Sequence, residues 1–363
     1  MKIVKKAISL ITLTILFPLA SQANVDSLAN KSWDEVVSQA KDEGEINFNV
    51  WYLQPRWRDF VKEFENEYGI KVNIAEGTID AQFNKLLSEK NDKIGKIDVI
   101  ALATSRFPIV QKNEAIARLN WIPEYSDKVN FIEGFDTGEY AVAFWGNQTG
   151  IAYDPDRISE ESLPQTFDEL NSWIKNNPYM FGYNDPNNGG AGNAFIQRAT
   201  VLTSGEFDFS STTVDPKVVT NWSKTWQWFV DNKENIVLTG SGADSITRLN
   251  DGEFILVPAW EDHLAGLQKA GAITPRLKFY VPEFGMLGGG NIIAMPANAK
   301  NSAAAAVFIN WLTSEATQKK LNTEFGTVPM IKNQLDPNNQ VLGFSAEYGA
   351  ELKKQFVTKV MMK

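Results

Sequence analysis

Asp98-Val99-Ile100-Ala101-Leu102-Ala103 is the stretch that decides the fold. An acidic residue followed by five apolar ones is typical of a short strand buried on both faces, as the strands of parallel sheets are. Two further strands are expected before it, at residues 46–52 and 71–75, and a helix-spaced apolar pattern follows each of them. This alternation predicts an α/β fold with a doubly wound parallel sheet, helices on both faces and a ligand site at the carboxyl ends of the strands.

A second unit of the same kind follows along the chain. Residues 140–144 and 150–153 have the composition of strands and flank a polar, turn-prone Gly146-Asn147-Gln148. Later strands are expected at 278–281 and 291–295, separated by a glycine-rich segment. A chain that leaves one lobe, builds a second and returns crosses twice between them. Two crossings suit opening and closing around a cleft.

The starts of several helices can be read from capping residues. Ser32-Trp33-Asp34-Glu35 and Thr166-Phe167-Asp168-Glu169 are capping boxes. Ser302 is expected to cap a helix that begins with four alanines. The last apolar pattern, from Leu352 to Val360, predicts a helix that either lobe could hold.

The chain is expected to begin with a cleavable export signal at residues 1–23. Three lysines precede an apolar run at 7–20, and Ser21-Gln22-Ala23 supplies the small residues at which such signals are cleaved. The run is too short for a stable anchor, and no later stretch is long and apolar enough to span a bilayer. The chain has no cysteine, so no lipid-anchoring cysteine follows the signal. We therefore expect a soluble protein of the periplasm.

Charge and composition exclude several kinds of partner. Removing the three signal lysines from the net charge of −9 leaves −12, without long runs of one sign. Nucleic acid and anionic membranes are therefore not expected as partners. With no cysteine and a single histidine, His263, a zinc or copper site is not expected either.

Motifs along the whole chain after residue 23 resemble one family. They include Phe60-Val61 and Phe64-Glu65 before Tyr68-Gly69-Ile70-Lys71-Val72; Lys96-Ile97-Asp98-Val99; residues 140–153; Leu163 to Leu170; and Ile292 to Leu312 with Pro296, Ala297, Phe308 and Ile309. In these segments the chain resembles the extracellular solute-binding proteins of ATP-driven importers, the group that takes up polyamines, thiamine, iron and sugars.

The resemblance implies a type II-like periplasmic binding protein fold. One lobe would comprise residues 24–143 and 288–334, and the other residues 144–287 and 335–363. It further implies a monomer with no cofactor and no catalytic activity, which delivers a small-molecule solute to an inner-membrane ABC permease. Iron-binding members use two adjacent tyrosines late in the chain, and no Tyr-Tyr pair occurs here. Ferric ion is therefore disfavoured.

In the first lobe, the candidate ligand-binding residues follow the expected strands. Trp51 and Tyr52 end the first strand, where aromatic rings could stack on a solute or cage a cation, although alternation would bury one of the two. Thr78 and Ser105 follow the next two strands at helix starts. Such positions bind polar groups, but simple helix capping accounts for them equally well. Trp145 lies at the first crossing.

In the second lobe, Asp185 and Asn193 belong to a glycine-rich loop that leads into a helix. Flexibility alone would explain its glycines, and it lacks the Gly-Lys-Ser/Thr of a phosphate loop. The sharpest cluster is Trp260-Glu261-Asp262-His263, with Glu283 after the following strand. In polyamine-binding relatives, acidic and aromatic residues in such loops hold ammonium groups. Asp262 could instead cap a helix, and Glu283 could be a surface charge.

These residues predict a small, polar and positively charged solute, such as a polyamine or thiamine. A sugar is the alternative with the same fold, because tryptophan stacking and carboxylate hydrogen bonds also suit hydroxyl groups. A periplasmic hydrolase or lyase is the alternative of another class. Its acid–base groups are scarce: Glu261 and Asp262 are adjacent and tend to point apart, and no Gly-x-Ser-x-Gly motif occurs.

Overall fold

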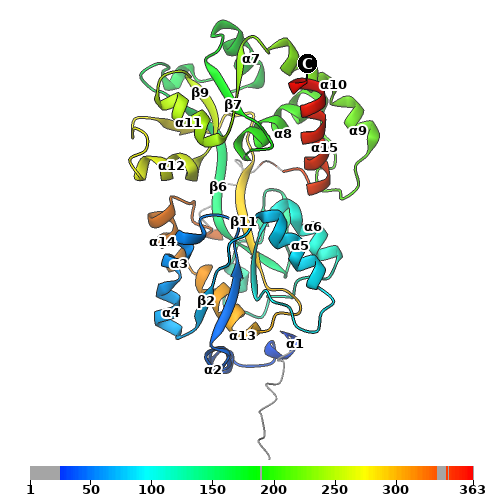
Figure 1. The fold of residues 1–363 in the computed structure, drawn as a ribbon, viewed down its shortest axis with the longest axis vertical. Coiled ribbons are helices and arrows are strands. Elements are labelled where there is room, and N and C mark those ends of the chain that lie inside the picture. The colour runs from blue at the N-terminus through cyan, green and yellow to red at the C-terminus, as the bar shows by residue number, and fades with distance from the viewer. Residues whose placement is uncertain (1–24, 189, 333–340, 342, 363) are drawn as a thin grey trace, which may run out of the picture.

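The computed structural model describes residues 25–188, 190–332, 341 and 343–362. The export signal expected at 1–23 therefore lies outside the described residues, as do residues 333–340 around one expected lobe boundary. Figure 1 shows two lobes, one above the other, joined by the long strands β6 and β11. In the described part of the chain, no helix is both long and apolar enough to span a bilayer.

The first lobe is built on one half of a continuous sheet, in the order β2-β1-β3-β11-β6. β1 pairs in parallel with β2 and β3, whereas β11 is antiparallel to both β3 and β6. The strands are β1 (Glu45–Asn49), β2 (Lys71–Asn73), β3 (Val99–Ala103), β6 (Ala141–Tyr153) and β11 (Gly288–Ala294), with the small hairpin β4 (Phe131–Ile132) and β5 (Phe135–Asp136).

Helices from both ends of the chain cover this half of the sheet. Its two buried clusters combine residues of the first 145 positions with residues beyond 291, so the lobe is discontinuous in sequence. The helices are α1 (Val25–Leu28), α2 (Trp33–Glu43), α3 (Gln54–Phe60), α4 (Lys62–Tyr68), α5 (Ile79–Glu89), α6 (Phe107–Lys112), α13 (Ser302–Leu312) and α14 (Glu315–Phe325).

The second lobe continues the same sheet as β6-β9-β7-β8, with β10 paired to β6. β7 runs parallel to β8 and β9, and β6 is antiparallel to β9 and β10. Its elements are α7 (Phe167–Asn176), β7 (Phe181–Asn184), α8 (Gly190–Ser204), α9 (Pro216–Asn221), α10 (Ser223–Asp231), β8 (Ile236–Thr239), α11 (Gly242–Asn250), β9 (Leu256–Trp260), α12 (Glu261–Lys269), β10 (Lys278–Tyr280) and α15 (Ala346–Phe356).

The C-terminal helix α15 packs on the second lobe. Tyr348, Leu352 and Phe356 are buried in the same cluster as Phe195 and Phe229 of that lobe. The rings of Phe229 and Phe356 lie 5.3 Å apart and perpendicular to each other. The sequence had not decided on which lobe this helix packs, and the structure places it on the second.

The capping motifs are partly as expected. Both capping boxes are present, with Ser32 bonded reciprocally to Glu35 and Thr166 to Glu169. The expectation for Ser302 was wrong by one position, because Asn301 is the N-cap residue and Ser302 is the first residue of α13. The backbone N–H of Asn301 donates to the buried carboxylate of Asp98 (2.8 Å), the residue directly before β3. This hydrogen bond ties the start of α13 to the sheet.

The first crossing differs more from its prediction. Residues 140–144 and 150–153 do not form two strands around a turn, because β6 runs unbroken through Gly146-Asn147-Gln148. These three residues pair with Gly290, Gly289 and Gly288 of β11, so the second half of the glycine-rich segment is also strand. Strand pairing holds both crossings in extended form.

Candidate functional site

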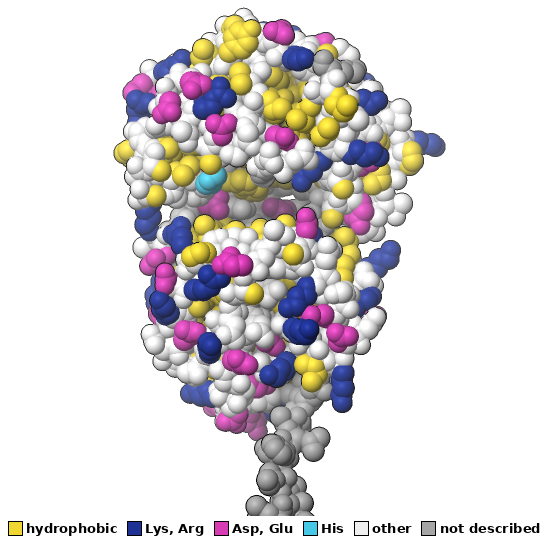
Figure 2. Space-filling model, viewed as in Figure 1, with side chains coloured by type: hydrophobic (Ala, Val, Ile, Leu, Met, Phe, Trp, Pro, Cys, Tyr) yellow, Lys and Arg dark blue, Asp and Glu magenta, His cyan; other side chains and the backbone are white. Residues whose placement is uncertain are grey.

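A cavity of about 690 Å³ lies between the lobes. Figure 2 shows it as a hollow that runs across the middle of the molecule. Its walls come from the ends of β1, β3 and β9, from the crossings β6 and β11, and from the starts of α8 and α12. This is the edge at which parallel strands present ligand sites.

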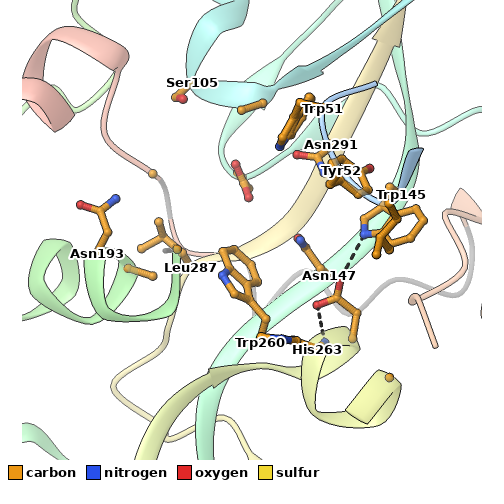
Figure 3. A pocket seen from close by; sticks show the side chains of 18 of the residues that line it. Trp51, Tyr52, Ser105, Trp145, Asn147, Asn193, Trp260, His263, Leu287 and Asn291 are labelled. Atoms are coloured by element: carbon orange, nitrogen blue, oxygen red, sulfur yellow. Dashed lines mark hydrogen bonds between the residues drawn. The ribbon is translucent and has the colours of Figure 1, made fainter. Parts of the chain in front are cut away.

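The structure brings seven of the predicted residues together. The residues that line this cavity are Trp51, Tyr52, Ser105, Trp145, Asn193, Trp260 and Asp262. Figure 3 shows most of them converging from both lobes on the same space.

Four predicted residues are not in the lining of the cavity. Thr78 accepts a hydrogen bond from the Ala81 N–H (3.2 Å), which is plain capping of α5. Asp185 accepts from the Asn187 N–H (2.8 Å) within its own turn. Glu261 begins α12 but is not among the residues that line the cavity, and Glu283 is an exposed loop residue.

Aromatic side chains form one wall of the cavity. The rings of Trp51 and Tyr52 lie 4.8 Å apart, and those of Tyr52 and Trp145 lie 4.9 Å apart, both edge to face. Trp260, the last residue of β9, reaches into the cavity from the second lobe (Figure 3). A methyl group on Gly190 would overlap the Trp260 indole, so the glycine at the start of α8 makes room for this ring.

Asp262 is the carboxyl group that the second lobe contributes. Its Oδ2 accepts a hydrogen bond from the Trp145 indole N–H (3.1 Å), and its Oδ1 accepts from the His263 backbone N–H (2.9 Å). Burial raises the pKa of Asp262, and the hydrogen bond from Trp145 opposes that rise. The carboxylate is thus partly desolvated and held in a fixed orientation.

Glu133 is the carboxyl group of the first lobe, and sequence reasoning missed it. It accepts hydrogen bonds from the Thr104 hydroxyl and from the Gly290 N–H (3.4 Å). Burial raises the pKa of Glu133 to about 7. The residue sits in the two-residue turn of the β4–β5 hairpin, so the available signal was Glu133-Gly134 between the apolar residues Ile132 and Phe135.

Polar residues of the two crossings complete the cavity. Asn147 of β6 and Asn291 of β11 line it, and the Asn291 amide donates to the Tyr52 hydroxyl (3.2 Å). At the rim, the Arg56 guanidinium lies over the Phe325 ring, 4.4 Å from its centre. The sequence pattern had suggested that Asn147 was part of a turn, and nothing in the local pattern marked Asn291.

The lining combines aromatic faces with carboxyl groups. Aromatic faces and carboxylates are the groups that bind organic cations, the first through the ring quadrupole and the second through charge-assisted hydrogen bonds. Among the residues that the structure describes, no group of three or more histidine, cysteine or acidic side chains is placed to hold a metal ion.

Comparisons with known proteins agree with this geometry. A family model described as bacterial extracellular solute-binding protein matches residues 59–341. No curated protein matches the chain.

Several solved structures share the fold. An ABC transporter protein from Clostridium perfringens is 20% identical, with 87% of this chain and 99% of that chain covered and a TM-score of 0.63. A spermidine/putrescine substrate-binding protein from Streptococcus pneumoniae is 12% identical, with 87% and 98% covered and a TM-score of 0.67. An iron-bound protein from Pseudomonas aeruginosa is 18% identical, with 86% and 98% covered and a TM-score of 0.62. These similarities confirm the type II-like periplasmic binding protein fold.

Proposed function

Because this chain belongs to the bacterial extracellular solute-binding proteins, we propose that it captures a small cationic solute between its lobes and delivers it to an inner-membrane ABC importer. Lobes divided at residues 143/144, 287/288 and 334/335 are part of this proposal, although the side chains of Phe144 and Trp145 pack in the buried cluster of the first lobe. Export by residues 1–23 to the periplasm and action as a monomer are also part of it. The family is one of binding proteins, so the hydrolase or lyase alternative is not retained.

The observation that carries the proposal is the pair of carboxyl groups, one from each lobe. Glu133 and Asp262 both line the cavity, and burial raises the pKa of each. A buried carboxylate is costly unless a cation or strong donors accompany it. An ammonium group bound between the lobes would supply that partner and favour the ionised form of both.

The aromatic wall supports the same class of solute. A cation over the face of a tryptophan gains about 0.5–2 kcal/mol, with the larger value in desolvated sites. Trp51, Trp145 and Trp260 all line the cavity, together with Tyr52. A polyamine or thiamine would use both the rings and the carboxylates. The spermidine/putrescine-binding structure from Streptococcus pneumoniae is consistent with a polyamine.

Thermal unfolding in the presence of candidate solutes tests the proposal. A solute that binds the native state alone raises the midpoint by mass action, and about 2.7 kcal/mol of stabilisation is expected at a concentration of 100 Kd. We expect spermidine, putrescine or thiamine to raise the midpoint and sugars to leave it unchanged. If a sugar stabilises the protein and no cation does, the cationic assignment is wrong.

Replacing Trp260 with alanine tests the site. Loss of one aromatic wall should weaken binding of the stabilising cation by about tenfold. Tyr179→Ala is the matched control, because Tyr179 is an aromatic residue that is 54% exposed and is not part of the cavity lining. Equal affinities for the two variants, measured by titration calorimetry, would contradict the site assignment.

A further inference from the structure

Helix α12 belongs to the second lobe but is tied to the first lobe at both ends. Its buried face packs in a cluster of the second lobe. Near its start, Asp262 accepts the hydrogen bond from Trp145, whose ring is buried in the first lobe. At its end, the Lys269 ammonium donates to the carbonyl groups of Thr323 and Glu324 (3.2 Å to the latter) in the last turn of α14. A cation there also suits the negative end of that helix.

Trp145 is held rigidly by its neighbours. It is 2% exposed. Its ring lies 4.9 Å from Tyr52, 5.5 Å from Trp57 and 5.1 Å from Phe325, all residues of the first lobe. The indole N–H therefore points in a direction that the first lobe sets, and it cannot follow α12 if the second lobe rotates away.

We propose that Trp145 is a positioning residue: it fixes the Asp262 carboxylate for the solute, and it does so only while the two lobes stand as close as they do here. The inference rests on the proposed function, since it assigns how the carboxylate of the second lobe meets the solute. It adds that Trp145 acts through Asp262 and not through its ring alone.

The two hydrogen-bond donors of Asp262 explain why the orientation of its carboxylate depends on the distance between the lobes. The His263 N–H holds one oxygen from the same helix and moves with it. The Trp145 N–H holds the other oxygen from the opposite lobe. Rotation at the β6 and β11 crossings separates the second donor from its acceptor, so the carboxylate loses a partner and its fixed orientation when the cleft opens. Closure of the lobes and presentation of the carboxylate are thus one event.

The chain offers a matched pair of tryptophans for the test. Trp57 lies in the same aromatic cluster and is fully buried, but among the described residues its indole N–H has no hydrogen-bond partner. Trp145→Phe and Trp57→Phe therefore make the same change in neighbouring rings. Only the first removes the hydrogen bond to Asp262.

Calorimetric titration with spermidine measures the effect on binding. A hydrogen bond to a charged group is worth about tenfold or more in affinity. We expect Trp145→Phe to weaken binding by about that factor and Trp57→Phe to change it less than twofold. In an Asp262→Ala background, which has no side-chain acceptor for the indole N–H, Trp145→Phe should have little further effect. An undiminished further loss there would overturn the inference.

The pH dependence of the affinity for spermidine is a second test of the hydrogen bond between Trp145 and Asp262. The hydrogen bond from Trp145 opposes the rise in the pKa of Asp262 that burial causes, so its removal should move the loss of affinity on acidification to higher pH. Glu261 and His263 on α12 and Tyr52 from the first lobe are the titratable groups that face Asp262. They are the same in both variants, and Trp57→Phe should therefore keep the wild-type profile.

A measurement without solute separates this inference from the proposed function. The chain has no cysteine, so Lys112→Cys and Lys217→Cys, both at exposed positions, give one spin-label site in each lobe. We expect Trp145→Phe to shift the distances between the labels to larger values, and Trp57→Phe to leave them unchanged. Wild-type distances in Trp145→Phe would overturn the inference. Failure of the wild-type protein to bind any cation would overturn the proposed function. The distances between the labels would still show whether the bond from Trp145 to Asp262 keeps the lobes close.

Discussion

Glu133 places its carboxyl group in the cavity through a backbone conformation that few residues adopt. Its φ of 53° is in the left-handed region, and the following Gly134 has a φ of 78°. Such a conformation costs a non-glycine residue on the order of 1–3 kcal/mol and persists where the surroundings impose it. The short hairpin and the bonds to Thr104 and Gly290 impose it here.

Glu133→Gln should change how stability depends on pH. Burial raises the pKa of Glu133 from 4.5 to about 7 in the folded protein. The folded state thus holds the proton more tightly than the unfolded chain, and ionisation of Glu133 destabilises the fold. This penalty is absent below about pH 4.5, grows up to about pH 7 and is constant above that. The thermal unfolding midpoint of Glu133→Gln, relative to that of the wild-type protein, should rise over the same pH range.

Scanning calorimetry at pH 4, 6 and 8 without solute checks this prediction. Glu234→Gln is the control, because Glu234 is an exposed residue outside the cavity lining. A Glu133→Gln advantage that is equal at pH 4 and pH 8 would show that the carboxyl group is not destabilised by ionisation.

At this scale the sequence predicts where site residues gather but not which side chains face the ligand. Trp260 and Asp262 were found because they follow a strand, and the carboxyl edge of the sheet is a general site. Glu261 has the same position in the pattern, yet successive helix residues point about 100° apart, and Asp262 alone of the two lines the cavity. Glu133 was missed because the hairpin that carries it leaves almost no periodic signal.

The crossing strands show how glycine can mislead a reading of the elements. Gly146 was expected in a turn and Gly290 in a glycine-rich segment between two strands, but both lie within strands. A methyl group on Gly146 would overlap the carbonyl oxygen of Val328, and one on Gly290 would overlap that of Trp145. These glycines allow backbones to approach closely, a requirement that depends on distant segments and has no local pattern.

Gly290→Ala should therefore destabilise the protein. Gly290 has a φ of 125°, and the added methyl group meets backbone atoms that cannot move aside as a side chain could. We expect a loss of about 2 kcal/mol or more in the free energy of unfolding. Gly349→Ala in α15 is the matched control, since nothing lies within 4 Å of the added methyl group and alanine favours helix by about 1 kcal/mol. Urea denaturation that finds the two variants equally stable would contradict this account.

For the whole molecule, the alternation of strands and helices was sufficient to predict the fold class. The two-lobed α/β architecture is confirmed, because each buried strand carries its own apolar signal and each helix its own spacing. The distance between the lobes could not be predicted in this way. Contacts such as Lys269 with α14 join residues more than fifty positions apart and follow no local pattern.

A bound cation should make the whole molecule more compact. The solute would contact carboxyl groups of both lobes, so it favours conformations in which the lobes are close. We expect saturating spermidine to lower the radius of gyration in small-angle X-ray scattering, with the forward scattering of a monomer throughout. Trp260→Ala at the same spermidine concentration should respond less. An unchanged radius of gyration under conditions in which calorimetry shows full binding would contradict closure on the solute.

The place of β11 in the sheet also sets the order in which the chain can fold as it is synthesised. β11 lies between β3 and β6, yet it is made after the sheet of the second lobe. A nascent chain that has reached residue 287 has a first lobe with a gap in its sheet and two unpaired strand edges, whereas β6 to β10 of the second lobe have all been made. Pairings between segments so far apart form late. The sheet of the first lobe can therefore be completed only after Ala294, the last residue of β11, has been made.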